Sequence, residues 1–133
     1  MIAVFVDASF WIALRDCRDT NHKQATLIGS ELAKMRRRLV STHLVFGEIY
    51  AYFSRFSKLR QQVIRDFWSG GVAGLEQATP EDYQEALATL RNAIDKDYSF
   101  CDAVSFAVMK RLELRDVLSF DAHFRQIGEF NVL

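Results

Sequence analysis

Four acidic residues in this chain each stand beside an apolar run, and their side chains could do chemistry together. They are Asp7, Glu48, Asp102 and Asp121. Burying a carboxylate next to an apolar segment is costly unless a donor or a cation pairs with it. If the four groups converge, their mutual repulsion favours a divalent cation, and oxygen ligands suit Mg²⁺ or Mn²⁺. Such a site is typical of enzymes that hydrolyse phosphate esters.

Strands and helices alternate along the whole sequence, and this order predicts where the acids lie. Apolar, β-branched runs predict strands at 2–6, 39–40, 72–78, 117–118 and 130–133. Helical spacing and capping residues predict helices at 9–14, 22–37, 42–56, 58–68, 80–94, 99–112 and 122–126. The order predicts an α/β three-layer sandwich with a mainly parallel central sheet flanked by helices, as a single domain over 1–133.

Two of the acids directly follow predicted strands. Asp7 follows the first strand and Asp121 follows the fourth, so both should lie at the carboxyl edge of the sheet, where this fold class binds ligands. Each also has a purely structural interpretation. Asp7 can form an Asx turn with Ala8 and Ser9, and Asp121 can cap the helical turn at His123.

The other two acids fall on predicted helices. Glu48 shares a helix face with Val45 and Tyr52, which predicts an inward carboxylate that needs a partner. The structural alternative is a pairing with a basic residue such as Arg55. Asp102 forms a capping box with Ser99, which already explains it. The apolar run that follows nevertheless predicts a buried helix, whose N-terminus can help to hold a phosphate.

Charge is unevenly distributed although the net charge is zero. Residues 1–70 hold eleven Lys/Arg against six Asp/Glu, and residues 71–133 hold six against eleven. The basic half could steer a phosphate backbone toward the acids, although solvated helix faces explain the clusters equally well. The candidate basic residues are Arg15, Lys23, Arg36, Arg37 and Arg38.

Several classes of protein are disfavoured by what the sequence lacks. The cysteines, Cys17 and Cys101, form no CxxC pair, and the three histidines show no zinc-ligand spacing. Lone thiols suit a reducing cytoplasm. The opening 1–14 run carries an acid and no basic region, so it predicts a strand and helix and neither a signal peptide nor a membrane span. No Gly-rich loop follows the first strand, which disfavours nucleotide binding.

The four acids lie in strings that together are fairly specific. Asp7 and Ser9 stand in Val-Asp-Ala-Ser after an apolar strand, and Glu48 closes Leu-Val-Phe-Gly-Glu on a mid-chain helix. The third acid, Asp102, stands in Ser-Phe-Cys-Asp-Ala-Val-Ser-Phe, and the fourth, Asp121, in Ser-Phe-Asp-Ala-His-Phe. In these strings the sequence resembles the PIN-domain family, and closely its VapC-type toxins, over nearly its whole length. Ser119 stands where the family commonly has Thr, and the hydroxyl is kept.

This resemblance implies a Mg²⁺- or Mn²⁺-dependent ribonuclease, the toxin of a toxin–antitoxin pair, cytoplasmic and often a homodimer. A small cognate antitoxin would block it. We hypothesise that Asp7, Asp102 and Asp121 hold the metal directly and that Glu48 binds it through water or holds a second ion. Ser9 and Ser119, each two residues from an acid, could orient that acid or hold a metal-bound water, although capping is the commoner role of such serines. Two other functions remain open: an RNA-processing nuclease without an antitoxin, and a non-catalytic PIN-like binding module.

Overall fold

The centre of the molecule is a five-stranded sheet whose paired strands are all parallel, in the order β3-β2-β1-β4-β5. The computed structural model describes residues 3–69, 72 and 74–133. The strands are β1 (Ala3–Val6), β2 (Arg38–Thr42), β3 (Gly74–Glu76), β4 (Asp116–Leu118) and β5 (Asn131–Val132). The chain runs outward from β1 to β2 and β3 and then returns to β4 on the other side of β1, so the direction of strand order reverses between β1 and β4. This reversal, the crossing point of the sheet, is where a parallel sheet of this class opens a ligand crevice.

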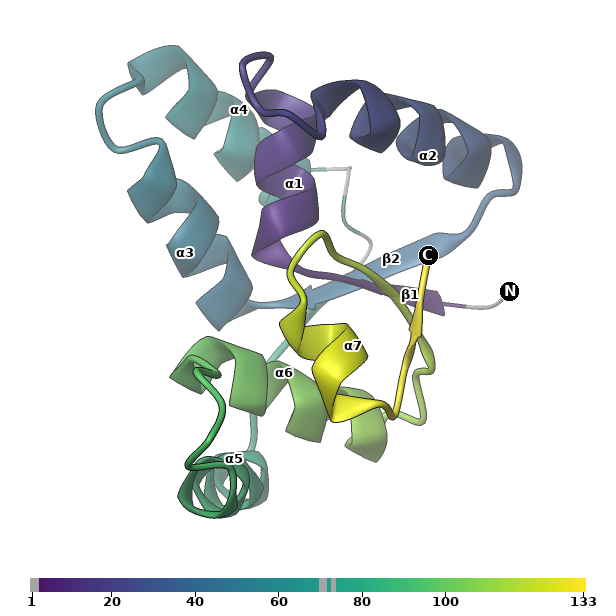
Figure 1. Cartoon of the computed structure of the whole chain (residues 1–133). Coiled ribbons are helices and arrows are strands. Elements are labelled where there is room, and N and C mark those ends of the chain that lie inside the picture. The colour runs from purple at the N-terminus through teal and green to yellow at the C-terminus, as the bar shows by residue number, and fades with distance from the viewer. Residues whose placement is uncertain (1–2, 70–71, 73) are drawn as a thin grey trace.

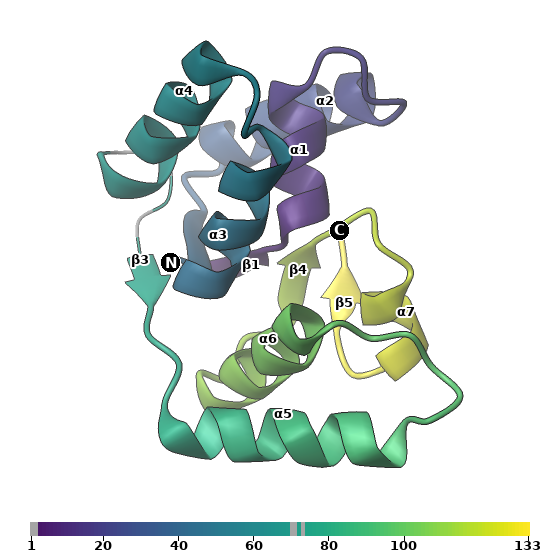
Figure 2. The same ribbon diagram turned by 90° about the vertical axis from the view of Figure 1, so that its left-hand side faces the viewer.

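Helices cover both faces of the sheet. They are α1 (Ala8–Arg15), α2 (His22–Lys34), α3 (His43–Tyr52), α4 (Ser57–Trp68), α5 (Pro80–Asn92), α6 (Phe100–Arg111) and α7 (His123–Ile127). Figures 1 and 2 show α1, α2 and α4 on one side of the sheet and α5 and α6 on the other. The predicted three-layer α/β sandwich is confirmed, and the sheet is entirely parallel within the described residues.

The core joins the middle of the sheet to helices on both of its faces, including α1 on one face and α6 on the other (Figures 1 and 2). The β1 side chains of Val4, Phe5 and Val6 have no exposed surface, and every α6 residue from Cys101 to Met109 is buried. A helix that is apolar on every side must be covered on every side. The prediction of a buried helix beginning beside Ser99 is therefore confirmed from Cys101 onward, whereas Ser99 and Phe100 at its N-terminus are exposed.

The two predicted capping boxes are present. Thr79 and Asp82 close one at the start of α5, and Ser99 and Asp102 close the other at the start of α6. A buried ion pair joins the two helices, because Arg111 of α6 donates to Asp82 at 3.0 Å. The pair holds α6, and so its N-terminal acid, in a fixed position against α5.

Some predicted boundaries were wrong. Asp7, and not Ser9, caps α1, because its carboxylate accepts from the Ser9 backbone. Helix α2 ends three residues early, since Arg36 adopts the left-handed conformation with φ of 53°. Helix α3 ends at Tyr52 where a helix to residue 56 was predicted. The predicted strand start at Ile2, the glycine pair 70–71 that was expected to end α4, and Ala73 fall outside the described residues.

None of the described helices is long and apolar enough to cross a membrane.

Candidate metal centre

All four acids line one open cleft at the carboxyl edge of the sheet. Asp7 ends β1, Asp121 lies in the loop after β4, Asp102 is in the first turn of α6 and Glu48 projects from α3. The cleft has a volume of about 630 Å³ and is also lined by Ser9, Ile12, Tyr52, Ser99 and His123. The predicted convergence is therefore observed: residues more than a hundred positions apart in the chain share one concave surface.

Asp7 is held by two serine hydroxyls. Ser9 donates its hydroxyl to Asp7 Oδ2 at 2.8 Å, and Ser119 donates to the same oxygen at 3.0 Å. The serine hydroxyls are themselves 3.1 Å apart, and Ser119 Oγ also accepts from the Asp121 backbone at 3.0 Å. Ser119 thus links the first and the fourth acid through one atom. Both serines therefore orient the Asp7 carboxylate, and Ser119 also contacts the Asp121 backbone.

Burial governs the charge of Asp7. The residue is 3% exposed. Burial raises the pKa of Asp7 to about 6, and the charge of Asp102 adds to this, although the hydrogen bonds from Ser9 and Ser119 work in the opposite direction. Without a cation, a desolvated acid near a second acid resists ionisation. A cation in the cleft would offset both effects, because its charge favours the ionised form of each carboxyl group.

The hydrogen bonds of Asp102 and Asp121 use only one oxygen of each carboxylate. Asp102 Oδ2 accepts from the Ser99 backbone at 3.0 Å, and Asp121 Oδ1 accepts from the His123 backbone at 3.0 Å. Within the described part of the chain, Asp102 Oδ1 and Asp121 Oδ2 accept no hydrogen bond. The structural interpretations of both residues are thus realised, and each carboxylate still keeps one oxygen for a metal ion.

His123 is the residue of the cleft that sequence reasoning missed, since a surface or capping role was expected. Its Nδ1 lies 2.5 Å from Asp102 Oδ2 and 3.1 Å from Asp121 Oδ1, and its Nε2 lies 2.9 Å from Asp97. Burial opposes the charge of the ring, but the Asp97 hydrogen bond and the charges of Asp102 and Asp121 outweigh it and raise the pKa of His123. The available signal was the Asp121-x-His123 spacing, which puts both residues on one turn.

Glu48 lies at the rim of the cleft. The inward position predicted from its helix face was wrong, because the residue is exposed and its face partner Tyr52 is 49% exposed. Partial burial still raises the pKa of Glu48, together with the charges of Asp102 and Asp121, against a hydrogen bond from the Cys101 thiol. Among the described residues Glu48 makes no ion pair with Arg55 or another base.

The candidate basic residues are not gathered at the cleft. Arg15 forms a bidentate ion pair with the buried Asp66, at 2.6 Å for both bonds, and Arg37 pairs with Asp116 at 2.7 Å. Arg38 begins β2, so residues 36–38 lie at the amino edge of the sheet, opposite the acids. Lys23 is exposed at the start of α2. Arg15 and Arg37 thus have structural partners, and the RNA-binding prediction for these five residues gains no support from their positions.

The donor set fits a hard divalent cation. Carboxylate oxygens from three strand or helix ends face one cleft, and one ligand atom each from Asp102, Asp121 and His123 lie within 4.8 Å of one another. Carboxylates suit Mg²⁺ and Mn²⁺, and a neighbouring imidazole favours the transition metal of the two. The fold and the cleft together define a parallel α/β domain with an acid-lined cleft that could hold a divalent cation.

The family is shown by comparison with known proteins. The PIN domain model matches residues 4–130, and the chain belongs to the PIN-domain family. VapC20 of Mycobacterium tuberculosis, a 23S rRNA-specific endonuclease, is 31% identical over 126 residues, which is 94% of each chain, in two strains. The crystal structure of M. tuberculosis VapC20, a Sarcin-Ricin loop cleaving toxin, aligns with a TM-score of 0.84 and 27% identity over 98% of both chains. The predicted resemblance to VapC-type PIN domains is confirmed.

Proposed function

We propose that this chain is a metal-dependent endoribonuclease and the toxin of a toxin–antitoxin pair, acting as one PIN domain in the cytoplasm. The observation that carries the proposal is the shared cleft of Asp7, Glu48, Asp102 and Asp121 at the crossing point of the sheet. Relatives over 94% of the chain that bear the VapC20 name support the same chemistry. An RNA-processing nuclease without an antitoxin remains the alternative.

In this proposal Asp7, Asp102 and Asp121 hold Mg²⁺ or Mn²⁺ directly, and Glu48 binds it through water or holds a second ion. When bound, the metal supplies an activated water for in-line attack at phosphorus and offsets charge on the scissile phosphate. Ser9 and Ser119 keep Asp7 oriented through Oδ2, at 2.8 Å and 3.0 Å. The products are a 5′-phosphate and a 3′-hydroxyl, as the family resemblance implies.

The first RNA to test is ribosomal. The curated relative is described as specific for 23S rRNA and its crystal structure as that of a Sarcin-Ricin loop cleaving toxin. We extend the same target to this chain, because the alignment covers the whole site from Asp7 to Asp121. A stem-loop RNA of the Sarcin-Ricin type is therefore the substrate on which cleavage should be measured.

A small cognate antitoxin would block the cleft. A cleft with four acids attracts a basic side chain, and a protein helix can deliver one while it covers neighbouring apolar surface. Tyr52, at the cleft wall, is 49% exposed and offers such surface. We propose in addition that the chain forms a homodimer, which the large exposed apolar side chains support, Leu27, Met35 and Trp68 among them.

The deciding experiment combines toxicity with cleavage. The wild-type chain, expressed alone, should arrest growth, and the product of a neighbouring short reading frame should relieve the arrest. The purified protein with Mn²⁺ should cut the ribosomal stem-loop, and Asp7→Asn should lose both effects. Asp95→Asn is the matched control, since Asp95 is an exposed acid paired with Lys96 in a turn outside the cleft. Cleavage by Asp7→Asn at the wild-type rate would refute the proposed site.

A further inference from the structure

A second pocket lies beside the acid cleft, on the same edge of the sheet. Six residues line it: Thr42, His43, Leu44, Gln77, Ala78 and Tyr83. They come from the end of β2, the start of α3, the segment after β3 and the first turns of α5. We infer that this pocket binds one unstacked nucleobase of a single-stranded RNA segment whose backbone runs through the acid cleft. The inference rests on the proposed ribonuclease function and names the part of the substrate that the pocket recognises.

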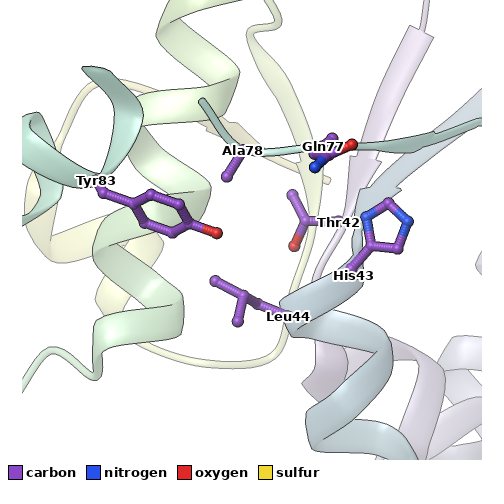
Figure 3. Close-up of a pocket in the computed structure, with 6 residues that line it drawn as sticks. All are labelled: Thr42, His43, Leu44, Gln77, Ala78 and Tyr83. Carbon is purple, nitrogen blue, oxygen red and sulfur yellow. The ribbon is translucent and has the colours of Figure 1, made fainter. Parts of the chain in front are cut away.

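The size of the pocket suits one planar ring system. Its volume is about 230 Å³. Pockets for drug-sized ligands measure roughly 300–1,000 Å³. Figure 3 shows Tyr83 on one side with its hydroxyl directed toward Thr42 and Leu44, and the His43 ring on the far side. Tyr83 and His43 thus lie on opposite sides of the pocket, with Thr42 and Leu44 between them (Figure 3).

Exposed aromatic side chains extend from both walls. Tyr83 is 36% exposed and stacks on Phe100, with ring centroids 5.9 Å apart and planes 10° apart. Trp68 is 55% exposed and packs against His43 at 5.6 Å. Monomeric proteins leave such clusters uncovered mainly where a partner or ligand docks. Successive aromatic rings along a groove are how proteins stack the bases of single-stranded nucleic acid.

Polar groups at the pocket can read the edge of a base. Gln77 is exposed, and its side-chain amide, which is both a donor and an acceptor, makes no hydrogen bond within the described chain. The exposed His43 imidazole is likewise not hydrogen-bonded within the described residues. The pocket therefore offers both aromatic rings and polar groups that have no hydrogen-bond partner among the described residues. This combination favours a nucleobase as the ligand, because an apolar protein side chain would cover the polar groups and leave them without partners.

The pocket and the cleft adjoin the same two helix starts. Leu44 lines the pocket and Glu48 lines the cleft, one turn apart on a shared face of α3. Phe100, which stacks on Tyr83, is next in the chain to Ser99, which lines the cleft beside Asp102. A strand of RNA with a phosphate at the acids therefore passes the stacked rings with a neighbouring base.

The test measures binding without cleavage. The probe is a short single-stranded RNA that carries the fluorescent adenine analogue aminopurine, whose emission falls when it stacks. It is titrated in EDTA against protein with Asp7→Asn. Tyr83→Ala should weaken binding roughly 5- to 150-fold and restore the emission, because one stacked base contributes about this much. Tyr83→Phe, which keeps the ring, should bind within about twofold and shows that loss of the fold is not the cause.

The control variant is Phe56→Ala, a ring of similar exposure at 42% on the segment after α3. It should leave probe binding unchanged. Equal affinity for the Tyr83→Ala and parent proteins would overturn the pocket assignment while RNA cleavage by the wild-type chain still upheld the proposed function. Loss of antitoxin binding in Tyr83→Ala with unchanged RNA affinity would overturn it too and reassign the pocket to a protein partner. Absence of any cleavage would instead count against the ribonuclease function itself.

Discussion

Asp102 and His123 share a hydrogen bond of 2.5 Å through the same carboxylate oxygen that closes the capping box with Ser99. One atom therefore receives both the backbone of α6 and the ring of α7. The other oxygen of Asp102, a residue that lines the cleft, accepts no hydrogen bond from the described residues. His123 therefore orients the Asp102 carboxylate, a proposed metal ligand, through the oxygen that is not assigned to the metal.

Replacing His123 should weaken metal binding. In His123→Ala the Asp102 carboxylate loses the partner that fixes its rotation, and loss of such a supporting partner typically costs about 10–100-fold in metal affinity. Calorimetric titration of Mn²⁺ into the metal-free protein would measure the change. Asp97→Asn, which alters only the exposed partner on the far side of the ring, should have a smaller effect. Equal Mn²⁺ affinity in His123→Ala and wild type would remove the positioning role.

Asp7→Asn should stabilise the metal-free protein at neutral pH. Because burial raises the pKa of Asp7 from 3.8 to about 6, its contribution to folding is fully present below pH 3.8 and is lost as the pH rises through about 6. Asn cannot ionise, so this loss disappears. The gain should reach at most about 3 kcal/mol above that window.

Urea unfolding in EDTA on either side of pH 6 would measure this gain. The two proteins should converge in stability at acidic pH and diverge at neutral pH. Ser119→Ala is a useful companion, because it removes a hydrogen bond that lowers the pKa of Asp7 and leaves the carboxyl group in place. A constant difference between Asp7→Asn and wild type at every pH would contradict the ionisation of Asp7 as its cause.

Divalent metal should stabilise the fold through the acids. A ligand at one hundred times its dissociation constant stabilises the native state by about 2.7 kcal/mol. Mn²⁺ should therefore raise the Tm of the wild-type chain by several degrees and EDTA should reverse it. Asp102→Asn should lose most of the rise, whereas Asp95→Asn in the exposed turn should keep it. A rise of equal size in both variants would point to metal bound outside the cleft.

The variants Arg15→Ala and Lys23→Ala should distinguish a basic side chain that stabilises the fold from one that is free to contact RNA. Arg15 neutralises the buried Asp66, which also accepts from Trp11 at 2.9 Å. Removing Arg15 leaves that carboxylate short of its charged partner, at a cost of about 2–4 kcal/mol. Lys23→Ala, at an exposed position, should change unfolding by less than about 0.5 kcal/mol. If Arg15→Ala unfolds like wild type but binds RNA more weakly, its predicted role in RNA binding would be upheld.

The sequence was sufficient for the fold and for the meeting of the acids, and the reason is strand direction. A residue that directly follows a parallel strand must lie at the carboxyl edge, which placed Asp7 and Asp121 correctly. The same rule places residues that precede a strand at the amino edge. Applied to Arg38, it would have separated the Arg36–Arg38 run from the cleft in advance.

Side-chain detail depended on tertiary contacts that no local pattern contains. The helix face of Glu48 was read from apolar neighbours, but α3 packs its other residues inward and leaves this side at a rim. His123 reaches Asp102 only because α7 packs beside α6, through Phe106 and Phe124 with ring centroids 5.0 Å apart. Contacts between segments some twenty residues apart are invisible to helical or strand periodicity.

The link between Ser119 and Asp7 joins positions 112 residues apart, at the two ends of the chain. During synthesis the first acid leaves the ribosome long before the third and fourth are translated. A growing chain therefore holds an incomplete cleft until β4 has been synthesised and can dock beside β1. If ribosomal RNA is the substrate, the late pairing of β4 with β1 means that the nascent chain cannot cleave the ribosome that is translating it.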